Sequence, residues 1–422
     1  MSELEQPPSL WRHRDFLKLW SAETVSRFGS EVSNLAIPFV AIAVLKATPF
    51  EVALLTAVLF LPFLIFTLPA GVWIDRLARR PILIVSDVVR AIALASVPLA
   101  YAFDGLTMWQ LYVVGFVVGI GTVFFDVSYQ SYLPSLVERE QLVDGNAKLQ
   151  LSLAGSQTAG PGVAGALIGL LTAPVAVLVD AISFALSALF LARIKTQEDP
   201  PAREERRALR VELLEGLRFL WADKRIRAIA SSTMLFNFFS NITFSIFLVY
   251  AVRDLDLGAG TIGVLFALGN IGGLAGAILA RRISRTIGIG PAMALGGASS
   301  TALIIVPLAP TSNPFPFLLV AMFVMTFGVV VYNVTGISFQ QEITPDRMLG
   351  RLNASRRFLV WGVIPLGALA GGALASVFGL RATLFVGAIG IAFAVVPILL
   401  SPLRSLGPGQ SPVSASASSA QA

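Results

Sequence analysis

The chain has 422 residues, of which 55% are hydrophobic and 13% charged, with a net charge of +6 and a mean hydropathy of +0.78. A soluble domain carries about 25% charged residues, so most of this chain must face lipid or other apolar helices. The absence of cysteine excludes a disulfide scaffold, an iron–sulfur site and a thiol nucleophile, and a single histidine leaves almost no material for a metal site or a catalytic triad.

The distribution of apolar residues predicts an all-α membrane protein. Residues 1–15 are polar and lack the order of a cleaved signal peptide, which indicates a cytoplasmic tail. Apolar runs of about 20 residues suffice to cross a bilayer. They predict twelve transmembrane helices, at about 16–45, 52–74, 82–101, 107–130, 148–171, 174–192, 227–251, 259–280, 290–309, 314–340, 353–378 and 380–401.

The charged stretch 193–226 predicts a cytoplasmic linker between two six-helix bundles, 16–192 and 227–401. Residues 402–422 are rich in Ser, Ala and Pro and are expected to form a disordered tail. Most of the 31 Lys and Arg residues fall in the tails and in the loops after even-numbered helices. Such an excess marks the cytoplasmic side, so we expect both termini in the cytoplasm. The expected location is the cytoplasmic (inner) membrane.

The second half of the chain repeats the first. Residues 136–147 align without gaps to residues 343–354, and both segments end in an Asn-Ala pair. Two halves related by duplication predict pseudo-symmetric bundles with a substrate site between them, near the middle of the bilayer.

The loop between the second and third predicted helices, 71–81, is dense in acidic and basic residues and must turn in water at a membrane face. It resembles the G-x-x-x-D-R-x-x-R-R signature of the major facilitator superfamily at Gly71, Asp75, Arg76, Arg79 and Arg80. The resemblance implies two bundles that rock about a central site. It also implies a cytoplasmic latch that includes Asp87, with Asp75 meeting the start of helix 11 near Asn353.

Charges inside the predicted spans are costly and are therefore functional candidates. Glu23, Arg27 and Glu31 follow one another at intervals of four residues, so they share one face of the first helix. We expect Arg27 to pair with Glu23, which is either a self-satisfied ion pair or part of proton coupling. Glu31 is the candidate proton acceptor, alternating between Arg27 and water.

Helices 3 and 4 add further charges at similar depth. Arg90 on helix 3 and Asp126 on helix 4 are expected to pair between helices. In this pair Asp126 either carries a proton or acts as a fixed clamp at the cytoplasmic side. Asp180 on helix 6 lies near the predicted external end and is expected to be solvated.

The fifth predicted helix contains Gly160, Pro161 and Gly165. This segment resembles the glycine–proline motif of the antiporter members of the superfamily, which implies export rather than uptake. The chain is similar to the enterobactin-exporter-like and macrolide- and multidrug-efflux branch at Asp75-Arg76 and Arg79-Arg80, at residues 86–91 and at the two Asn-Ala loop ends.

The expected cavity has few other charges but many aromatic and amide side chains. An apolar wall with a few polar points suits amphiphilic or lipophilic molecules. The candidate cavity residues are Gln157, Asn237, Asn241, Asn270, Asn333, Tyr129, Tyr332 and Trp361.

These observations predict a proton-coupled secondary active exporter, a drug/H+ or siderophore/H+ antiporter. It needs no cofactor beyond the proton gradient and no metal, and no nucleotide-binding loop or nucleophile–base pair points to an enzyme. The expected partners are a small-molecule substrate, protons and the lipid bilayer, without nucleic acid, and the protein is expected to be a monomer. Two alternatives remain: an uptake symporter of the same fold and a non-transporting membrane sensor.

Overall fold

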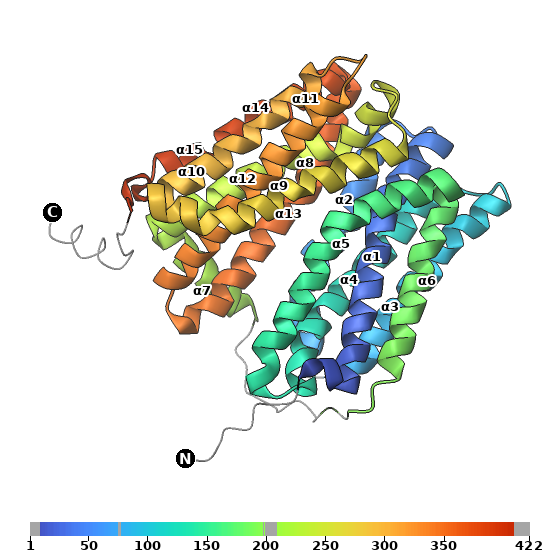
Figure 1. The fold of residues 1–422 in the computed structure, drawn as a ribbon, viewed down its shortest axis with the longest axis horizontal. Helices are drawn as coiled ribbons and strands as arrows, with labels where there is room; N and C mark the ends of the chain where they lie inside the picture. The colour runs from blue at the N-terminus through green and yellow to red at the C-terminus, as the bar shows by residue number, and fades with distance from the viewer. Residues whose placement is uncertain (1–8, 75–76, 197, 199–208, 409–422) are drawn as a thin grey trace. The chain divides into compact units, whose positions relative to one another are not determined.

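The computed structural model describes residues 9–74, 77–196, 198 and 209–408 (Figure 1). This part of the chain is helical and contains no strand, which confirms the predicted all-α class. Its helices are α1 (Arg14–Phe39), α2 (Pro49–Ile74), α3 (Arg79–Ala102), α4 (Met108–Leu136), α5 (Leu142–Leu171), α6 (Ala173–Ala192), α7 (Leu209–Ala222), α8 (Lys224–Arg253), α9 (Ala259–Ile287), α10 (Ile289–Ser299), α11 (Ile305–Leu308), α12 (Phe315–Ile343), α13 (Asp346–Phe378), α14 (Leu380–Phe393) and α15 (Val396–Leu399).

Short non-α segments extend several of these helices. The π-helical turn η2 (Val40–Val44) continues α1, and the 3-10 segment η4 (Ser300–Ile304) joins α10 to α11. The remaining 3-10 segments are η1 (Leu10–Arg12), η3 (Arg139–Gln141) and η5 (Pro402–Ser405).

Within the described residues, ten segments are long and apolar enough to cross a membrane. Helices α1 and α5 fall outside this set, although they contain 26 and 30 residues. The charges of Glu23, Arg27 and Glu31 account for α1, and the glycine- and hydroxyl-rich stretch around Gln157 lowers the hydropathy of α5. With these two helices, the described chain is consistent with the twelve predicted spans.

The chain divides into two compact units. The N-terminal unit holds α1, most of α2, α3 to α6 and the first turns of α9 (258–264). The C-terminal unit holds residues 48–57 of α2, together with α7, α8, the rest of α9 and α10 to α15.

Each unit shows the duplication in its own helix packing. In the N-terminal unit α1 packs against α5 and α6, and α3 packs against α4. In the C-terminal unit the corresponding helices make the same pairs, since α8 packs against α13 and α14, and α10 packs against α12. The aligned loops 136–147 and 343–354 therefore belong to a repeat of structure as well as of sequence.

The structure differs from the sequence prediction at the tails. Leu403 and Leu406 are buried against α8 and α10, so the disorder predicted from residue 402 onward is wrong as far as Leu406. Leu10, in the predicted N-terminal tail, packs into a core cluster with Phe16. Apolar residues that end a polar segment bury themselves when a helix end offers an uncovered apolar surface.

The predicted linker 193–226 contains the helix α7, which packs against α13. Gly216 allows this close approach, because a Cβ there would lie 2.5 Å from the carbonyl oxygen of Arg351. Arg351 in turn forms an ion pair with Glu215 at 2.5 Å. Helix α7 is therefore tied to the start of α13 within the C-terminal unit.

Candidate functional site

An ion cluster joins α1 to α4 in the N-terminal unit. The Nε of Arg27 donates a hydrogen bond to the Glu23 carboxylate at 2.5 Å, as the four-residue spacing predicts. The Nη2 of Arg27 lies 3.8 Å from an Asp126 carboxylate oxygen. Glu23 is buried, whereas Asp126 keeps 24% of its side chain exposed. One guanidinium thus serves two carboxylates in different surroundings.

The predicted pair between Arg90 and Asp126 is wrong. Arg90 instead binds Asp87, three residues earlier on α3, and both side chains are buried. The guanidinium carbon also lies 4.0 Å from the ring centroid of Phe184 and 4.5 Å from that of Phe125, which adds cation–π attraction. Residues three apart on a helix are neighbours. Asp87 on the same helix is therefore a nearer partner for Arg90 than Asp126, which was matched to it only by its depth in the membrane. Asp87 is therefore buried inside the bundle and paired within α3.

Asp180 on α6 is also buried, with 1% of its surface exposed, so the prediction of a solvated carboxylate is wrong. The Ser183 hydroxyl donates to its Oδ1 at 2.9 Å. On the α1 side, a Cβ added to Gly29 would lie 2.6 Å from the same oxygen. The position is interior because this face of α6 packs against α1.

The glycine–proline motif of α5 forms two close contacts. At Gly160 the missing side chain leaves room for Glu31 of α1, which also interacts with Asn34. Further along, Gly165 faces the first turns of α9, where an added Cβ would lie 2.5 Å from the Ala259 carbonyl oxygen. The Pro161 carbonyl lies against the same turns of α9. The motif therefore brings α5 close to α1 and to α9 within the N-terminal unit.

The signature loop is described only in part. Gly71 lies near the end of α2, whereas Asp75 and Arg76 lie outside the described residues, as does their predicted contact with α13. Arg79 and Arg80 begin α3, and their backbone N–H groups each donate at 2.7 Å to Glu198. A carboxylate is favourable there because the first amides of a helix lack partners inside it.

The side chain of Arg80 extends to the end of α6. It donates to the carbonyl oxygens of Leu191 at 3.0 Å and Ala192 at 2.5 Å. Both partners of this side chain are backbone carbonyl groups. Arg80 and Glu198 together tie the start of α3 to the end of α6.

Asp15 holds the chain just after α6 through hydrogen bonds to Lys195 and Thr196, an arrangement that we call the Asp15 clamp. Asp15, in the first turn of α1, accepts hydrogen bonds from the backbone of Lys195 at 3.1 Å and from the backbone and hydroxyl of Thr196 at 3.0 and 2.7 Å. Lys18 donates to its other oxygen at 2.6 Å. Burial alone would raise the pKa of Asp15, but these hydrogen bonds lower it well below its usual range. Sequence reasoning missed Asp15 and Glu198, because the backbone N–H groups that bind them, those of Lys195 and Thr196 and those of Arg79 and Arg80, are more than 100 residues away in the chain.

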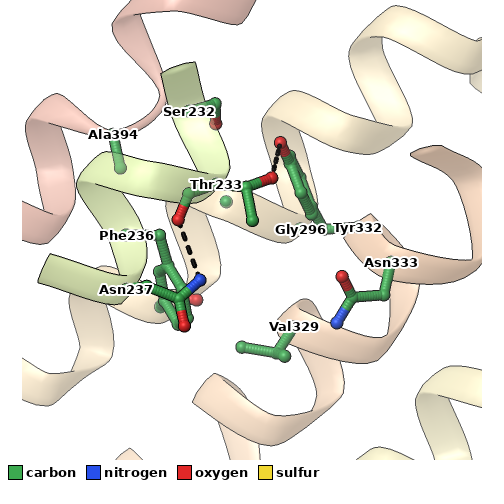
Figure 2. A pocket seen from close by; sticks show the side chains of 11 residues that line it. Ser232, Thr233, Phe236, Asn237, Gly296, Val329, Tyr332, Asn333 and Ala394 are labelled. Carbon is green, nitrogen blue, oxygen red and sulfur yellow. Dashed lines mark hydrogen bonds between the residues drawn. The ribbon is translucent and has the colours of Figure 1, made fainter. Parts of the chain in front are cut away.

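The C-terminal unit contains a cavity of about 150 Å³ between α8, α10, η4 and α12 (Figure 2). No charged side chain is among the described residues that line it. Those residues are Ser232, Thr233, Phe236, Asn237, Gly296, Gly297, Ser300, Val329, Tyr332, Asn333 and Ala394.

Three of the predicted cavity residues, Asn237, Tyr332 and Asn333, meet at this cavity. The hydroxyls of Tyr332 and Thr233 lie 3.1 Å apart, and the Asn237 amide donates to the Thr233 carbonyl at 2.9 Å. Sequence reasoning missed Ser300, because a serine in an apolar run carries no signal of its own.

The other predicted cavity residues do not line it. Asn241 donates to the Asn237 carbonyl at 2.7 Å, and Trp361 lies under the guanidinium of Arg357 on α13. Tyr129 is buried against Phe125 in the N-terminal unit. Gln157 is exposed on α5, and Asn270 lies on α9.

Comparison with known proteins gives the family and its relatives. The family model for the Major Facilitator Superfamily matches residues 19–364. The chain is 28% identical to the multidrug efflux pump Tap of Mycolicibacterium fortuitum over 367 residues, which cover 82% of this chain and 86% of that protein. It is 25% identical to macrolide efflux protein A of Streptococcus pyogenes over 402 residues, covering 93% and 97%.

Solved structures share the fold. A bacterial homologue of the iron transporter ferroportin in its inward-facing state superposes with a TM-score of 0.75 at 17% identity, covering 93% of this chain and 99% of that one. The nucleoside transporter NupG gives a TM-score of 0.73 at 14% identity, covering 92% and 99%. These likenesses concern the fold alone.

Proposed function

We propose that this chain, which belongs to the major facilitator superfamily, exports small amphiphilic or lipophilic molecules from the cell in exchange for protons. It is a multi-pass membrane protein, and its relatives Tap and macrolide efflux protein A are efflux pumps. Export proceeds by alternating access, with both termini in the cytoplasm. The proton gradient is the driving force, and no cofactor takes part.

The proposal is supported by the placement of ionisable groups in one unit and of an uncharged cavity in the other. Away from the helix ends, all the carboxylates of the described spans lie in the N-terminal unit. They are Glu23, Glu31, Asp87, Asp126 and Asp180. The cavity of the C-terminal unit is lined by uncharged aromatic, amide and hydroxyl groups. Intramembrane ionisable groups mark proton pathways, whereas an apolar wall with a few polar points binds a lipophilic molecule.

Arg27 is the group that can link protonation to a change of pairing. It lies 2.5 Å from Glu23 and 3.8 Å from Asp126. A proton bound at Asp126 removes the charge that draws Arg27 toward α4 and leaves the guanidinium with Glu23 alone. Glu31, two turns from Glu23 on the same helix, takes or releases the proton where Gly160 leaves room for its side chain.

The test is transport into inside-out membrane vesicles that contain the full chain. Hoechst 33342, a lipophilic dye, and radiolabelled erythromycin are suitable probes, since multidrug and macrolide efflux pumps are relatives. We expect accumulation when the vesicle interior is acidified and loss of accumulation when an uncoupler collapses the gradient. Proton-driven movement in the opposite direction would indicate an uptake symporter. A protein that moves no compound of a broad drug panel under any gradient would be a non-transporting sensor.

A further inference from the structure

We infer that the cavity between α8, α10, η4 and α12 is a subsite for one uncharged, ring-sized substituent of the transported molecule, held by hydrogen bonds and aromatic contact. The inference rests on the proposed export function and names the chemistry that this part of the protein selects. The cavity lies wholly within the C-terminal unit.

The size of the cavity limits its occupant. Its volume is about 150 Å³, and an apolar cavity of roughly 150 Å³ in a protein core binds one benzene molecule. A whole drug-sized molecule needs a pocket of about 300–1,000 Å³. The cavity therefore accepts one six-membered ring of a larger molecule and leaves the rest of that molecule outside.

Ser300 lines the cavity and carries a buried hydroxyl just behind its wall. This serine is 1% exposed, and its hydroxyl has no partner among the residues that the structure describes. Its neighbours behave differently, since Ser299 donates to the Gly296 carbonyl at 2.8 Å and Thr301 to the Ala298 carbonyl at 2.7 Å. A buried hydroxyl without a partner is unfavourable, so a guest toward which the Ser300 side chain turns to form a hydrogen bond binds with an advantage.

Amide groups add to this capacity from two helices (Figure 2). The Asn237 side chain donates through its nitrogen to the Thr233 carbonyl, which leaves its oxygen available as an acceptor. The Asn333 side chain extends from α12 toward the side on which α8 carries Asn237. With the Ser300 hydroxyl, the walls offer both donors and acceptors, as a ring that bears a hydroxyl or a carbonyl group requires.

The rest of the lining excludes charged occupants. No charged side chain is among the described lining residues, and an unpaired ion in such surroundings is strongly disfavoured. Water is the competing guest, and a buried water needs about three hydrogen bonds. Ser300, Asn237 and Asn333 together offer that number of polar groups, so water competes for the polar side of the cavity. The side chains of Phe236, Val329 and Ala394 offer water no hydrogen bond and favour the face of a ring, and the binding test below decides between the two occupants.

Direct binding of two matched probes tests the subsite. The probes are 4-fluorobenzyl alcohol and its charged analogue 4-fluorobenzylammonium, observed by fluorine NMR with the purified full chain in lipid nanodiscs and with empty nanodiscs as the baseline. We expect a saturable protein-bound signal from the alcohol and none from the ammonium compound. Equal binding of both probes, or binding of neither, would overturn the inference, and the second result would point to water as the occupant.

Two variants locate the signal. Ala394→Leu fills the cavity and is expected to abolish binding, whereas Ala392→Leu adds the same atoms on an exposed face of α14 and leaves binding intact. Ser300→Ala is expected to weaken binding about tenfold while raising the melting temperature of the empty protein, because an unpartnered hydroxyl is removed. Thr301→Val is its control, since that hydroxyl lies outside the cavity. A purely structural serine would not weaken binding and stabilise the protein together.

Unchanged binding in both Ala394→Leu and Ser300→Ala would place the probe elsewhere and overturn the subsite. If Ala394→Leu fails to fold, Ser300→Ala decides alone. The measurement needs no proton gradient, so it separates the two proposals. Vesicles that export nothing while the purified protein binds the alcohol would remove the export function and leave the subsite. Export without binding would do the reverse.

Discussion

Glu31 on α1 and Gly160 on α5 pack so closely that a Cβ added to the glycine would lie 2.6 Å from both the Cβ and the Cγ of Glu31. Such a distance is far inside van der Waals contact, where carbon atoms are about 3.5–4.0 Å apart. The polar stripe of the first helix and the glycine–proline motif of the fifth are therefore parts of one contact. The side chain proposed to carry the proton occupies the space that the glycine leaves.

Gly160→Ala is expected to displace Glu31 and to lower proton-driven export about tenfold. Overpacking costs about 1–3 kcal/mol in the conformation that packs Glu31 against α5, and a shift of 1.4 kcal/mol in a conformational equilibrium is a factor of ten. The measurement is initial export rate in vesicles at matched protein levels. Gly155→Ala is the control, since nothing lies within 4 Å of its added Cβ. It shares the gain in helix propensity without the displacement. Equal rates in the two variants would show that the contact does not position Glu31.

Glu31→Gln and Asp126→Asn are expected to separate substrate movement from proton coupling. Each replacement keeps the shape of the side chain and removes the group that binds a proton. We expect substrate exchange across the membrane without a pH gradient to continue, and gradient-driven accumulation to fall to the background level. Asp144→Asn, at an exposed carboxylate near the start of α5, is the control. If both variants keep full pH-driven accumulation, other groups carry the proton.

The sequence predicted the fold well because the bilayer imposes simple rules. The length of the spans follows from the thickness of the bilayer, and the duplication of 136–147 in 343–354 predicts two similar bundles. The ion pair of Arg27 with Glu23 is also predictable from sequence, because side chains four residues apart are neighbours on any helix. Contacts between side chains on one face of the same helix can therefore be predicted from sequence.

The faces through which different helices pack against one another could not be predicted from the sequence. Lipid tails are as apolar as leucine side chains, so hydropathy does not tell a bundle-facing side from a lipid-facing side. Depth along a helix is the remaining guide, and it places Asp180 near solvent and Arg90 beside Asp126. Packing instead buries Asp180 and pairs Arg90 with Asp87. Ser300 gives no signal in the sequence for the same reason, because only the packing of α8, η4 and α12 brings it to the wall of a cavity.

Asp87→Asn is expected to lower the stability of the protein by about 3–5 kcal/mol, because it leaves the buried Arg90 without its counter-charge. Thermal unfolding in detergent, followed by intrinsic fluorescence, measures the change. The matched control is Asp144→Asn, which breaks an ion pair with Lys148 whose carboxylate is 52% exposed. Exposed pairs contribute about 0–1 kcal/mol. Similar losses in the two variants would mean that burial does not make the Asp87–Arg90 pair important.

Asp15→Asn tests the Asp15 clamp through its dependence on pH. The folded pKa of Asp15 lies below its unfolded value of about 3.9. A carboxylate with a lowered pKa stabilises the folded state fully above its unfolded pKa, and this contribution disappears as pH falls toward the folded pKa. Hydrogen bonds to a charged group contribute about 1.5–3 kcal/mol each, and we expect the variant to lose at least one such contribution at pH 7.

The difference in melting temperature between wild type and Asp15→Asn is therefore expected to be several degrees at pH 7 and to shrink steadily below about pH 4. Glu140→Gln is the control, because Glu140 is an exposed carboxylate on the predicted cytoplasmic side. Its replacement should change the melting temperature little at either pH. A difference that stays constant from pH 7 to pH 3 would mean that the charge of Asp15 does not stabilise the clamp. Asp15 would then hold Thr196 through its shape and neutral hydrogen bonds alone.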